Sequence, residues 1–198
     1  MVCLILGDVM NILLLDNRDS FTYNIVNLIR KVNNHSFEVI SVDDINLQKV
    51  AFFDKIIFSP GPEIPEQEGI MKKILDKYAS SKSIFGICLG FQAVAQYFGT
   101  KLYNMETVCH GIQKDVYVKD PADRIFSGIP PVFKAGLYHS WAVISQSFPS
   151  ELRITARLSD NIIMAYSHIS LDICGVQFHP ESYMTPFGEK ILYNWLKE

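Results

Sequence analysis

The chain has 198 residues, of which 48% are hydrophobic and 20% charged, and its formal net charge is -3. This balance is typical of a globular protein that can bury a sizeable core, and one domain over residues 1–198 is the default expectation. The sequence has no cluster of lysine and arginine that would attract nucleic acid or an anionic membrane, so we expect neither as a partner.

The four cysteines, Cys3, Cys88, Cys109 and Cys174, lie far apart and form no C-x-x-C pair. We therefore predict neither a metal site nor a disulfide framework, and we expect a reducing, cytoplasmic setting. Cys109 and His110 are adjacent, but two neighbouring side chains without further spaced ligands favour an ordinary loop over a metal site.

The first residues, MVCLILGDVMNILLLD, are apolar enough to resemble a signal peptide. They have no basic segment, are interrupted by Gly7 and Asp8, and show no clear cleavage site. No apolar stretch is long enough to span a bilayer. Because Met10 directly precedes a strand-like run, we interpret residues 1–9 as an extension upstream of the fold.

Short apolar runs alternate with helical patterns in the first half of the chain. The runs predict buried strands at 11–15, 37–42, 55–59 and 82–87. The patterns between and after them predict helices at 21–32, 66–80 and 89–98. Buried strands separated by helices indicate an α/β fold, with an open, mostly parallel sheet flanked by helices.

The pattern changes after Gly99, where the segments become short and β-rich and are joined by turns. Strands are predicted at 101–104, 111–118, 132–143, 152–157, 162–167 and 173–178. We expect the second half to add antiparallel strands to the sheet. The chain ends with a predicted helix over 187–198, with Thr185 as its cap and Pro186 at its first position.

One cysteine, Cys88, stands between Gly86 and Gly90 in IFGICLGFQ, where a predicted strand meets a predicted helix. The pattern G-x-C-x-G has the form of a nucleophile elbow, in which glycines allow strand and helix to approach closely. A thiol at a helix N-terminus is favoured as a thiolate, and the backbone N–H of Leu89 would point toward the oxyanion of an attacked carbonyl. Alone, this motif fits a buried structural thiol equally well.

A thiol nucleophile needs a base, and the segment GVQFHPES offers one. His179 ends a strand-like run, Pro180 prevents further strand pairing, and Glu181 follows on the same side of an extended backbone. Glu181 is therefore placed to accept a hydrogen bond from one imidazole nitrogen of His179, which leaves the other nitrogen for the thiol.

Together, GICLGFQ and GVQFHPES resemble the class I, triad-type glutamine amidotransferases, and the resemblance extends from about residue 11 to the terminal helix. Within that family, DNRDSFTYN, SPGP at 59–62 and YHSWAV at 138–143 are similar to glutaminase subunits of anthranilate synthase and aminodeoxychorismate synthase. The resemblance implies Cys88 as nucleophile, His179 as general base and acid, and Glu181 as its orienting partner.

The resemblance also implies roles for five residues around this triad. Gly61 and Leu89 would supply the N–H groups of an oxyanion hole. Gln92 would hold the amino-acid end of the substrate, helped by the backbone around Ser140 and Trp141. The residues themselves support Gly61 independently, because a glycine between two prolines lets backbone approach a ligand without a Cβ, although an ordinary turn has the same pattern.

The chain departs from the usual subfamily pattern at three single positions near the predicted site, and CHGIQ at 109–113 only partly matches the usual segment. Glu63 stands where glycine is general, Arg18 replaces an aromatic residue, and Phe91 stands where histidine or methionine is frequent. None of the three belongs to the triad. We expect them to affect partner contacts and activity without a partner more than the chemistry.

The resemblance implies L-glutamine as substrate, and thioester chemistry of this kind needs no cofactor or metal. It further implies a separate chorismate-utilising synthase subunit that receives the ammonia, in a heterodimer or a larger complex. Whether this partner makes anthranilate or aminodeoxychorismate stays open. Two alternatives also stay open: a free-standing cysteine hydrolase of γ-glutamyl peptides, and a non-catalytic interaction subunit on the same fold.

Overall fold

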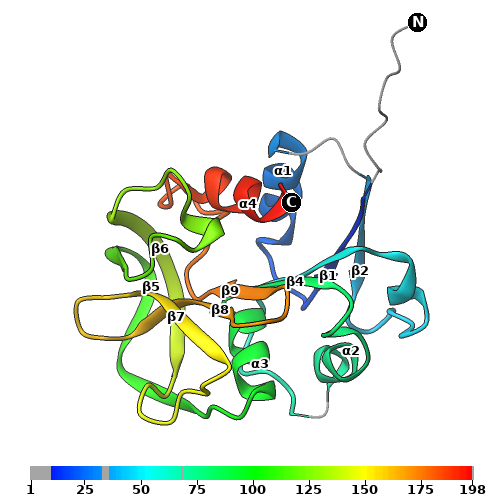
Figure 1. Cartoon of the computed structure of the whole chain (residues 1–198), viewed down its shortest axis with the longest axis horizontal. Coiled ribbons are helices and arrows are strands. Elements are labelled where there is room, and N and C mark those ends of the chain that lie inside the picture. The colour runs from blue at the N-terminus through cyan, green and yellow to red at the C-terminus, as the bar shows by residue number, and fades with distance from the viewer. Residues whose placement is uncertain (1–9, 33–35, 68, 198) are drawn as a thin grey trace, which may run out of the picture.

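A mixed sheet runs through the computed structural model, which describes residues 10–32, 36–67 and 69–197 (Figure 1). The extension expected over residues 1–9 lies outside the described residues. The strands are β1 (Asn11–Asp16), β2 (Ser36–Ser41), β3 (Lys55–Phe58), β4 (Ser83–Ile87), β5 (Leu102–Val118), β6 (Val132–Val143), β7 (Leu152–Arg157), β8 (Ile163–His168) and β9 (Ile173–Val176). The helices are α1 (Thr22–Val32), α2 (Ile70–Tyr78), α3 (Leu89–Tyr97) and α4 (Gly188–Leu196), with short 3₁₀ turns at Lys49–Phe52 and Arg124–Phe126.

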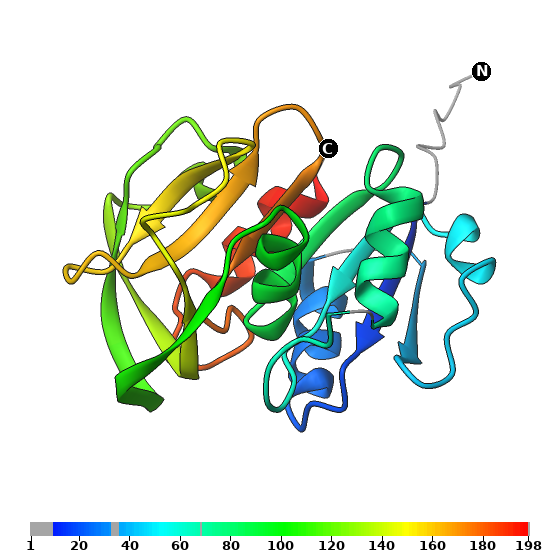
Figure 2. The ribbon, with the colours of Figure 1, turned by 90° about the horizontal axis from the view of Figure 1, so that it is seen from below.

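The strands are ordered β2-β1-β3-β4-β9-β8-β7-β5-β6 in the sheet. The first five run parallel, and β8, β7, β5 and β6 continue the sheet with antiparallel pairs. Figure 2 shows these antiparallel strands gathered at one end of the molecule and β1 to β4 at the other. This arrangement confirms the predicted fold class.

Two helices cover each face of the parallel part, with α1 and α4 on one side and α2 and α3 on the other (Figure 1). The alternation within β1 explains both layers, because successive side chains of a strand point to opposite faces. Ile12 and Leu14 pack into the cluster that contains α1 and α4, whereas Leu13 and Leu15 pack into the cluster under α2 and α3. A run of four apolar residues is thus a strand buried on both faces.

The later strands differ from the prediction in length and position. One continuous strand, β5, replaces the two predicted at 101–104 and 111–118, and its register against β6 shifts between Asn104 and Cys109 and between His110 and Ile112. Cys109 and His110 therefore lie in an irregular strand and not in the expected loop. The strand β9 is shorter than predicted and pairs parallel with β4, so it belongs to the first half of the sheet.

Thr185 does not cap the last helix, which begins at Gly188 rather than at Pro186. Its hydroxyl instead donates to the carbonyl of His179 at 2.6 Å and accepts from the N–H of Gly136 at 3.0 Å. Thr185 thus ties the turn that carries His179 to strand β6.

Among the described residues, no helix is long and apolar enough to cross a membrane.

Candidate active site

Cys88 occupies a strained bend between β4 and α3. Its φ of 50° and ψ of -99° lie in a region that a residue with a Cβ rarely adopts, at a cost on the order of 1–3 kcal/mol. Two backbone hydrogen bonds hold the bend: the N–H of Cys88 donates to Val176 O at 2.9 Å, and its carbonyl accepts from Gln92 N at 3.0 Å. The predicted elbow is therefore present, with its thiol at the first turn of α3.

The two glycines that flank Cys88 are required by close backbone contacts. A Cβ on Gly86 would lie 2.6 Å from the carbonyl carbon of Gly90, and a Cβ on Gly90 would lie 2.4 Å from Phe58 O. Both distances are far below van der Waals contact. The glycines thus let α3 pack directly against the ends of β3 and β4, and this packing fixes the position of the thiol.

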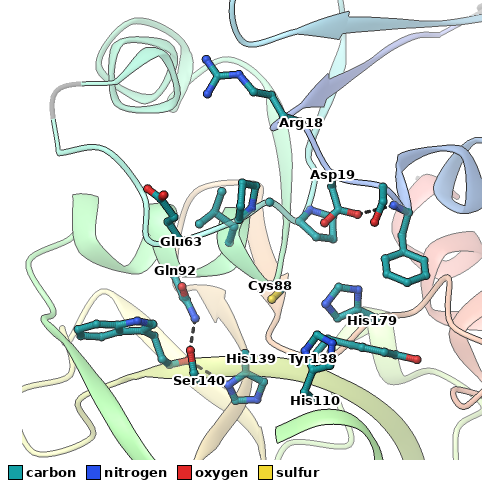
Figure 3. A pocket seen from close by; sticks show the side chains of 17 residues that line it. Arg18, Asp19, Glu63, Cys88, Gln92, His110, Tyr138, His139, Ser140 and His179 are labelled. Carbon is teal, nitrogen blue, oxygen red and sulfur yellow. Dashed lines mark hydrogen bonds between the residues drawn. The ribbon is translucent and has the colours of Figure 1, made fainter. Parts of the chain in front are cut away.

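His179 reaches Cys88 because β9 lies next to β4 in the sheet. The chain leaves β9 at the same edge as the elbow, and the N–H of His179 pairs with Gly136 O at 3.0 Å. In Figure 3 the imidazole lies beside the sulfur of Cys88, within a pocket that both residues line. Residues 91 positions apart in sequence are thereby brought together.

Glu181 fixes the orientation of the imidazole. Its Oε1 lies 2.6 Å from His179 Nδ1, and both side chains are at least 96% buried, with side-chain exposures of 4% and 1%. A carboxylate only accepts, so Nδ1–H donates, and Nε2 has no hydrogen-bond partner among the described residues. Burial by itself would lower the pKa of His179, but the negative charges of Cys88 and Glu181 raise that pKa well above 6.5.

Gly61 and Leu89, predicted as oxyanion donors, face one another at the pocket. A Cβ on Gly61 would lie 2.6 Å from Leu89 Cδ2 and 2.8 Å from Asn17 O, so only glycine fits there. Asn17 holds this loop, because its Nδ2 donates to Ser59 O and its N–H donates to Ser59 Oγ, each at 2.9 Å. The N–H of Leu89 lies at the N-terminus of α3, where no intrahelical acceptor exists.

The predicted substrate-binding residues Gln92, Ser140 and Trp141 line the same pocket. The carbonyl of Trp141 accepts from Gln92 Nε2 at 2.8 Å and lies 2.9 Å from His139 Nδ1. The Trp141 backbone therefore orients Gln92, and the oxygen of the Gln92 amide is the part left to face the pocket (Figure 3).

The pocket has a volume of about 380 Å³, within the range of small-molecule sites. Its wall includes seven of the eight predicted site residues; Glu181 lies behind His179. The lining residues are Arg18, Asp19, Ser20, Phe21, Pro60, Gly61, Pro62, Glu63, Cys88, Leu89, Gln92, His110, Tyr138, His139, Ser140, Trp141 and His179. No group of three or more metal-ligating side chains occurs in the part of the chain that the structure describes.

Ten of the pocket residues were not predicted as site residues, and four of these affect its packing and charge. Tyr138 packs edge-on against the ring of His179, with centroids 4.9 Å apart, and Phe21 packs against both rings. Burial raises the pKa of Asp19 above its ordinary value. Burial also lowers the pKa of His139 to about 4, so this second imidazole is neutral at pH 7. Asp19 and Phe21 lie in the loop after β1, whereas Tyr138 and His139 lie in β6. No single motif contains both segments, so the sequence does not show that they meet.

Gln177 is a further residue that sequence reasoning missed, although it lies inside the GVQFHPES motif. Its side chain is fully buried and contacts both Gln92 and the sulfur of Cys88. The available signal was a polar residue inside the apolar run that predicts a buried strand, two positions before the predicted base.

The three departures from the subfamily pattern have different surroundings. Glu63 has a φ of 62°, a left-handed conformation that glycine adopts without strain. Arg18, on the pocket rim, forms an exposed two-pronged ion pair with Asp43. Phe91 points into the core and packs against Tyr166 at a tilt, with ring centroids 4.5 Å apart, so it is not part of the site.

Comparison with known proteins shows the family to which the chain belongs. The model of the family described as glutamine amidotransferase class-I matches residues 13–198. A Haemophilus influenzae protein provisionally named anthranilate synthase component II is 46% identical over 94% of this chain and 96% of its own. Aminodeoxychorismate/anthranilate synthase component 2 of Bacillus subtilis is 37% identical over 94% of this chain and 95% of its own.

Solved structures share the fold at lower sequence identity. The crystal structure of a Thermoplasma acidophilum protein, provisionally named as part of GMP synthase, has a TM-score of 0.84 at 23% identity, covering 96% of this chain and 94% of that one. A glutamine amidotransferase of Thermotoga maritima has a TM-score of 0.75 at 13% identity, covering 96% of this chain and 98% of that one. These likenesses concern the fold alone.

Proposed function

Because this chain belongs to the class I glutamine amidotransferases, we propose that it is the glutaminase subunit of a chorismate-aminating synthase. The observation that carries the proposal is that Cys88 and His179 line one pocket, with His179 Nδ1 held 2.6 Å from Glu181 Oε1 behind it. This is the arrangement of nucleophile, base and orienting group that acyl transfer requires.

The first half of the reaction forms a thioester. The thiolate of Cys88 attacks the side-chain amide carbon of L-glutamine, and the oxyanion that forms is held by the N–H groups of Gly61 and Leu89. The raised pKa of His179 keeps its imidazole protonated, so Nε2–H donates its proton to the departing nitrogen. The C–N bond breaks, ammonia leaves, and a γ-glutamyl thioester remains on Cys88.

The second half releases glutamate. His179 Nε2, now neutral, takes a proton from water as the water oxygen attacks the thioester carbon. The C–S bond breaks, glutamate leaves, and the thiolate of Cys88 is restored beside a protonated His179. We propose that no cofactor or metal takes part in this chain, because each step is an acyl transfer or a proton transfer between named groups.

The pocket offers polar groups for the amino-acid end of the substrate. The amide oxygen of Gln92 is an acceptor suited to an α-ammonium group, because both hydrogens of its nitrogen are engaged elsewhere. Ser140 lies next to it on the pocket wall. We propose that these groups, together with the backbone near Trp141, select glutamine over a simple amide.

The Haemophilus influenzae and Bacillus subtilis relatives are named as components of anthranilate synthase or aminodeoxychorismate synthase, so the proposed partner is a synthase chain that uses chorismate. The complex would be a heterodimer or a larger assembly of such pairs. A cytoplasmic location is part of this proposal, and it agrees with the buried free thiols of Cys88, Cys109 and Cys174.

The test is glutamate release from L-glutamine by the purified chain, alone and with a candidate synthase plus chorismate. The proposal predicts a rate that rises several-fold with the synthase and chorismate. A rate that ignores the synthase but is higher with γ-glutamyl peptides would identify a free-standing hydrolase. A folded chain that binds the synthase and hydrolyses nothing would have a non-catalytic role in the complex.

A further inference from the structure

We propose that Gln177 is a further functional residue of this site, whose amide N–H stabilises the reactive sulfur of Cys88 and links it to the substrate-holding Gln92. The kinetic part of this inference rests on the proposed glutaminase function. The structural part, a hydrogen bond to the thiolate, does not depend on the substrate.

Gln177 is placed beside the sulfur by the sheet. It follows β9 directly, and its N–H donates to Met164 O of β8 at 2.9 Å. Because β9 pairs with β4 and Val176 O accepts from the N–H of Cys88, the side chain of Gln177 emerges next to the elbow. Its Nε2 lies 3.6 Å from Cys88 Sγ, within hydrogen-bond range for sulfur, and the residue is fully buried.

The direction of this hydrogen bond follows from a carbonyl that can only accept. Trp141 O lies 2.8 Å from the Gln92 amide, so the nitrogen of Gln92 must face it. The second hydrogen of that nitrogen then points to the Gln177 amide 3.0 Å away, which must present its oxygen. The nitrogen of Gln177 is therefore the atom that faces Cys88 Sγ.

Because Gln177 donates to Cys88 Sγ, it affects the charge of the sulfur. An N–H donor stabilises a negatively charged sulfur more than a neutral thiol, and it adds no charge of its own. Gln177 does not titrate, so it cannot replace His179 as a base. The same amide holds the second hydrogen of Gln92, which leaves only the Gln92 oxygen for the pocket. The side chain of Gln177 thus stabilises the thiolate of Cys88 and also determines which atom of Gln92 faces the substrate.

The first test is the alkylation rate of Cys88 by iodoacetamide as a function of pH, with the site identified by peptide mass. The variant Gln177→Met keeps the side-chain length and removes the donor. We expect the midpoint of its pH profile to move upward by about one unit, because the thiolate loses a stabilising hydrogen bond. Gln113→Met is the matched control, since this glutamine donates to Met184 O on the exposed surface.

The second test is glutaminase kinetics on the same proteins. Gln177→Met should lower kcat/KM roughly tenfold or more, with a lower kcat from the sulfur and a higher KM from the released Gln92. If this variant fails to fold, Gln177→Glu keeps the shape and the acceptor for Gln92. Its added negative charge should move the alkylation midpoint further upward.

The outcomes separate this inference from the proposed function. Alkylation profiles and kinetics of Gln177→Met that match those of Gln113→Met would overturn the inference. A shifted alkylation profile in a protein whose wild type releases no glutamate would support the contact between Gln177 and Cys88 and contradict the glutaminase proposal. A purely structural role would lower thermal stability without moving the alkylation midpoint, which would also overturn the inference.

Discussion

His179 Nδ1 and Glu181 Oε1 lie 2.6 Å apart, in a place where both side chains are almost completely shielded from water. A charge-assisted hydrogen bond of this kind fixes which nitrogen of the imidazole carries the proton. It also supplies part of the negative charge that opposes the effect of burial on the pKa of His179. The orientation of this imidazole thus depends on one carboxylate, and its protonation depends on the sulfur of Cys88 together with that carboxylate.

Replacing Glu181 by glutamine should remove this charge and leave the shape. The pKa of His179 then falls, because burial is no longer fully opposed, and the imidazole loses its fixed orientation. We expect kcat to fall on the order of 10²- to 10⁴-fold, and the pH–rate profile to shift toward lower pH. Glu189→Gln, on the exposed side of α4, is the control. A rate for Glu181→Gln equal to that of the control would remove Glu181 from the triad.

A methyl group on Gly61 should disrupt the proposed oxyanion hole. In Gly61→Ala the new Cβ meets Leu89 Cδ2 at 2.6 Å and Asn17 O at 2.8 Å, so the loop must move and carry its N–H away. We predict that kcat falls roughly 10²- to 10³-fold while KM changes little. Gly69→Ala is the matched control, because its Cβ also meets a neighbour, Glu66 Cβ at 2.9 Å, but Gly69 does not line the pocket. Equal kcat values in the two variants would refute the proposed role of Gly61.

Glu63→Gly should stabilise the protein. Glu63 has a φ of 62°, and relief of a left-handed conformation is worth about 1 kcal/mol, partly offset by the greater freedom of glycine in the unfolded chain. We expect a higher midpoint in urea denaturation than for the wild type. Glu66→Gly, at a position with ordinary φ, should instead lower the midpoint. A loss of stability in Glu63→Gly comparable to that control would show that the Glu63 side chain makes compensating contacts.

The buried His139 should make the fold sensitive to acid. Burial lowers its pKa from 6.5 to about 4, so between these values the unfolded chain binds a proton that the folded chain does not. Stability contributed by the neutral imidazole is therefore complete above pH 6.5 and is lost as pH falls through about 4. Over this pH range the free energy of unfolding should fall by about 3 kcal/mol, because each unit of the difference in the pKa of His139 corresponds to about 1.4 kcal/mol.

Urea denaturation between pH 7 and pH 4 measures this effect. In His139→Gln the dependence of the unfolding free energy on pH should be shallower than in the wild type, because this group no longer titrates. His110→Gln, at an exposed position, is the matched control. Identical slopes in both variants would show that His139 is not the group that responds to acid.

Much of the parallel sheet and the elbow was predictable because local pattern determines both. Four buried apolar runs between helical patterns give strands β1 to β4, and a cysteine between two glycines marks the bend after β4. The residues of the proposed triad could be named from the sequence because two motifs each carry their chemistry within a few residues. Cys88, His179 and Glu181 did not require knowledge of the sheet order.

The remaining features depend on contacts between distant segments. No local signal shows that β9 inserts between β4 and β8, and this placement alone brings Gln177 to the sulfur of Cys88. Thr185 has the local pattern of a helix cap, yet tertiary contacts with His179 and Gly136 recruit its hydroxyl instead. The irregular register of β5 likewise depends on pairing with β6.

The most direct test of the account is the rate of glutamate release by Cys88→Ser compared with the wild type, with equal thermal midpoints showing that both are folded. Serine keeps the size of the side chain but is a far weaker nucleophile at neutral pH. The account predicts a loss on the order of 10³-fold or more, with and without the synthase and chorismate. A folded Cys88→Ser protein that retains most of the wild-type rate would contradict it.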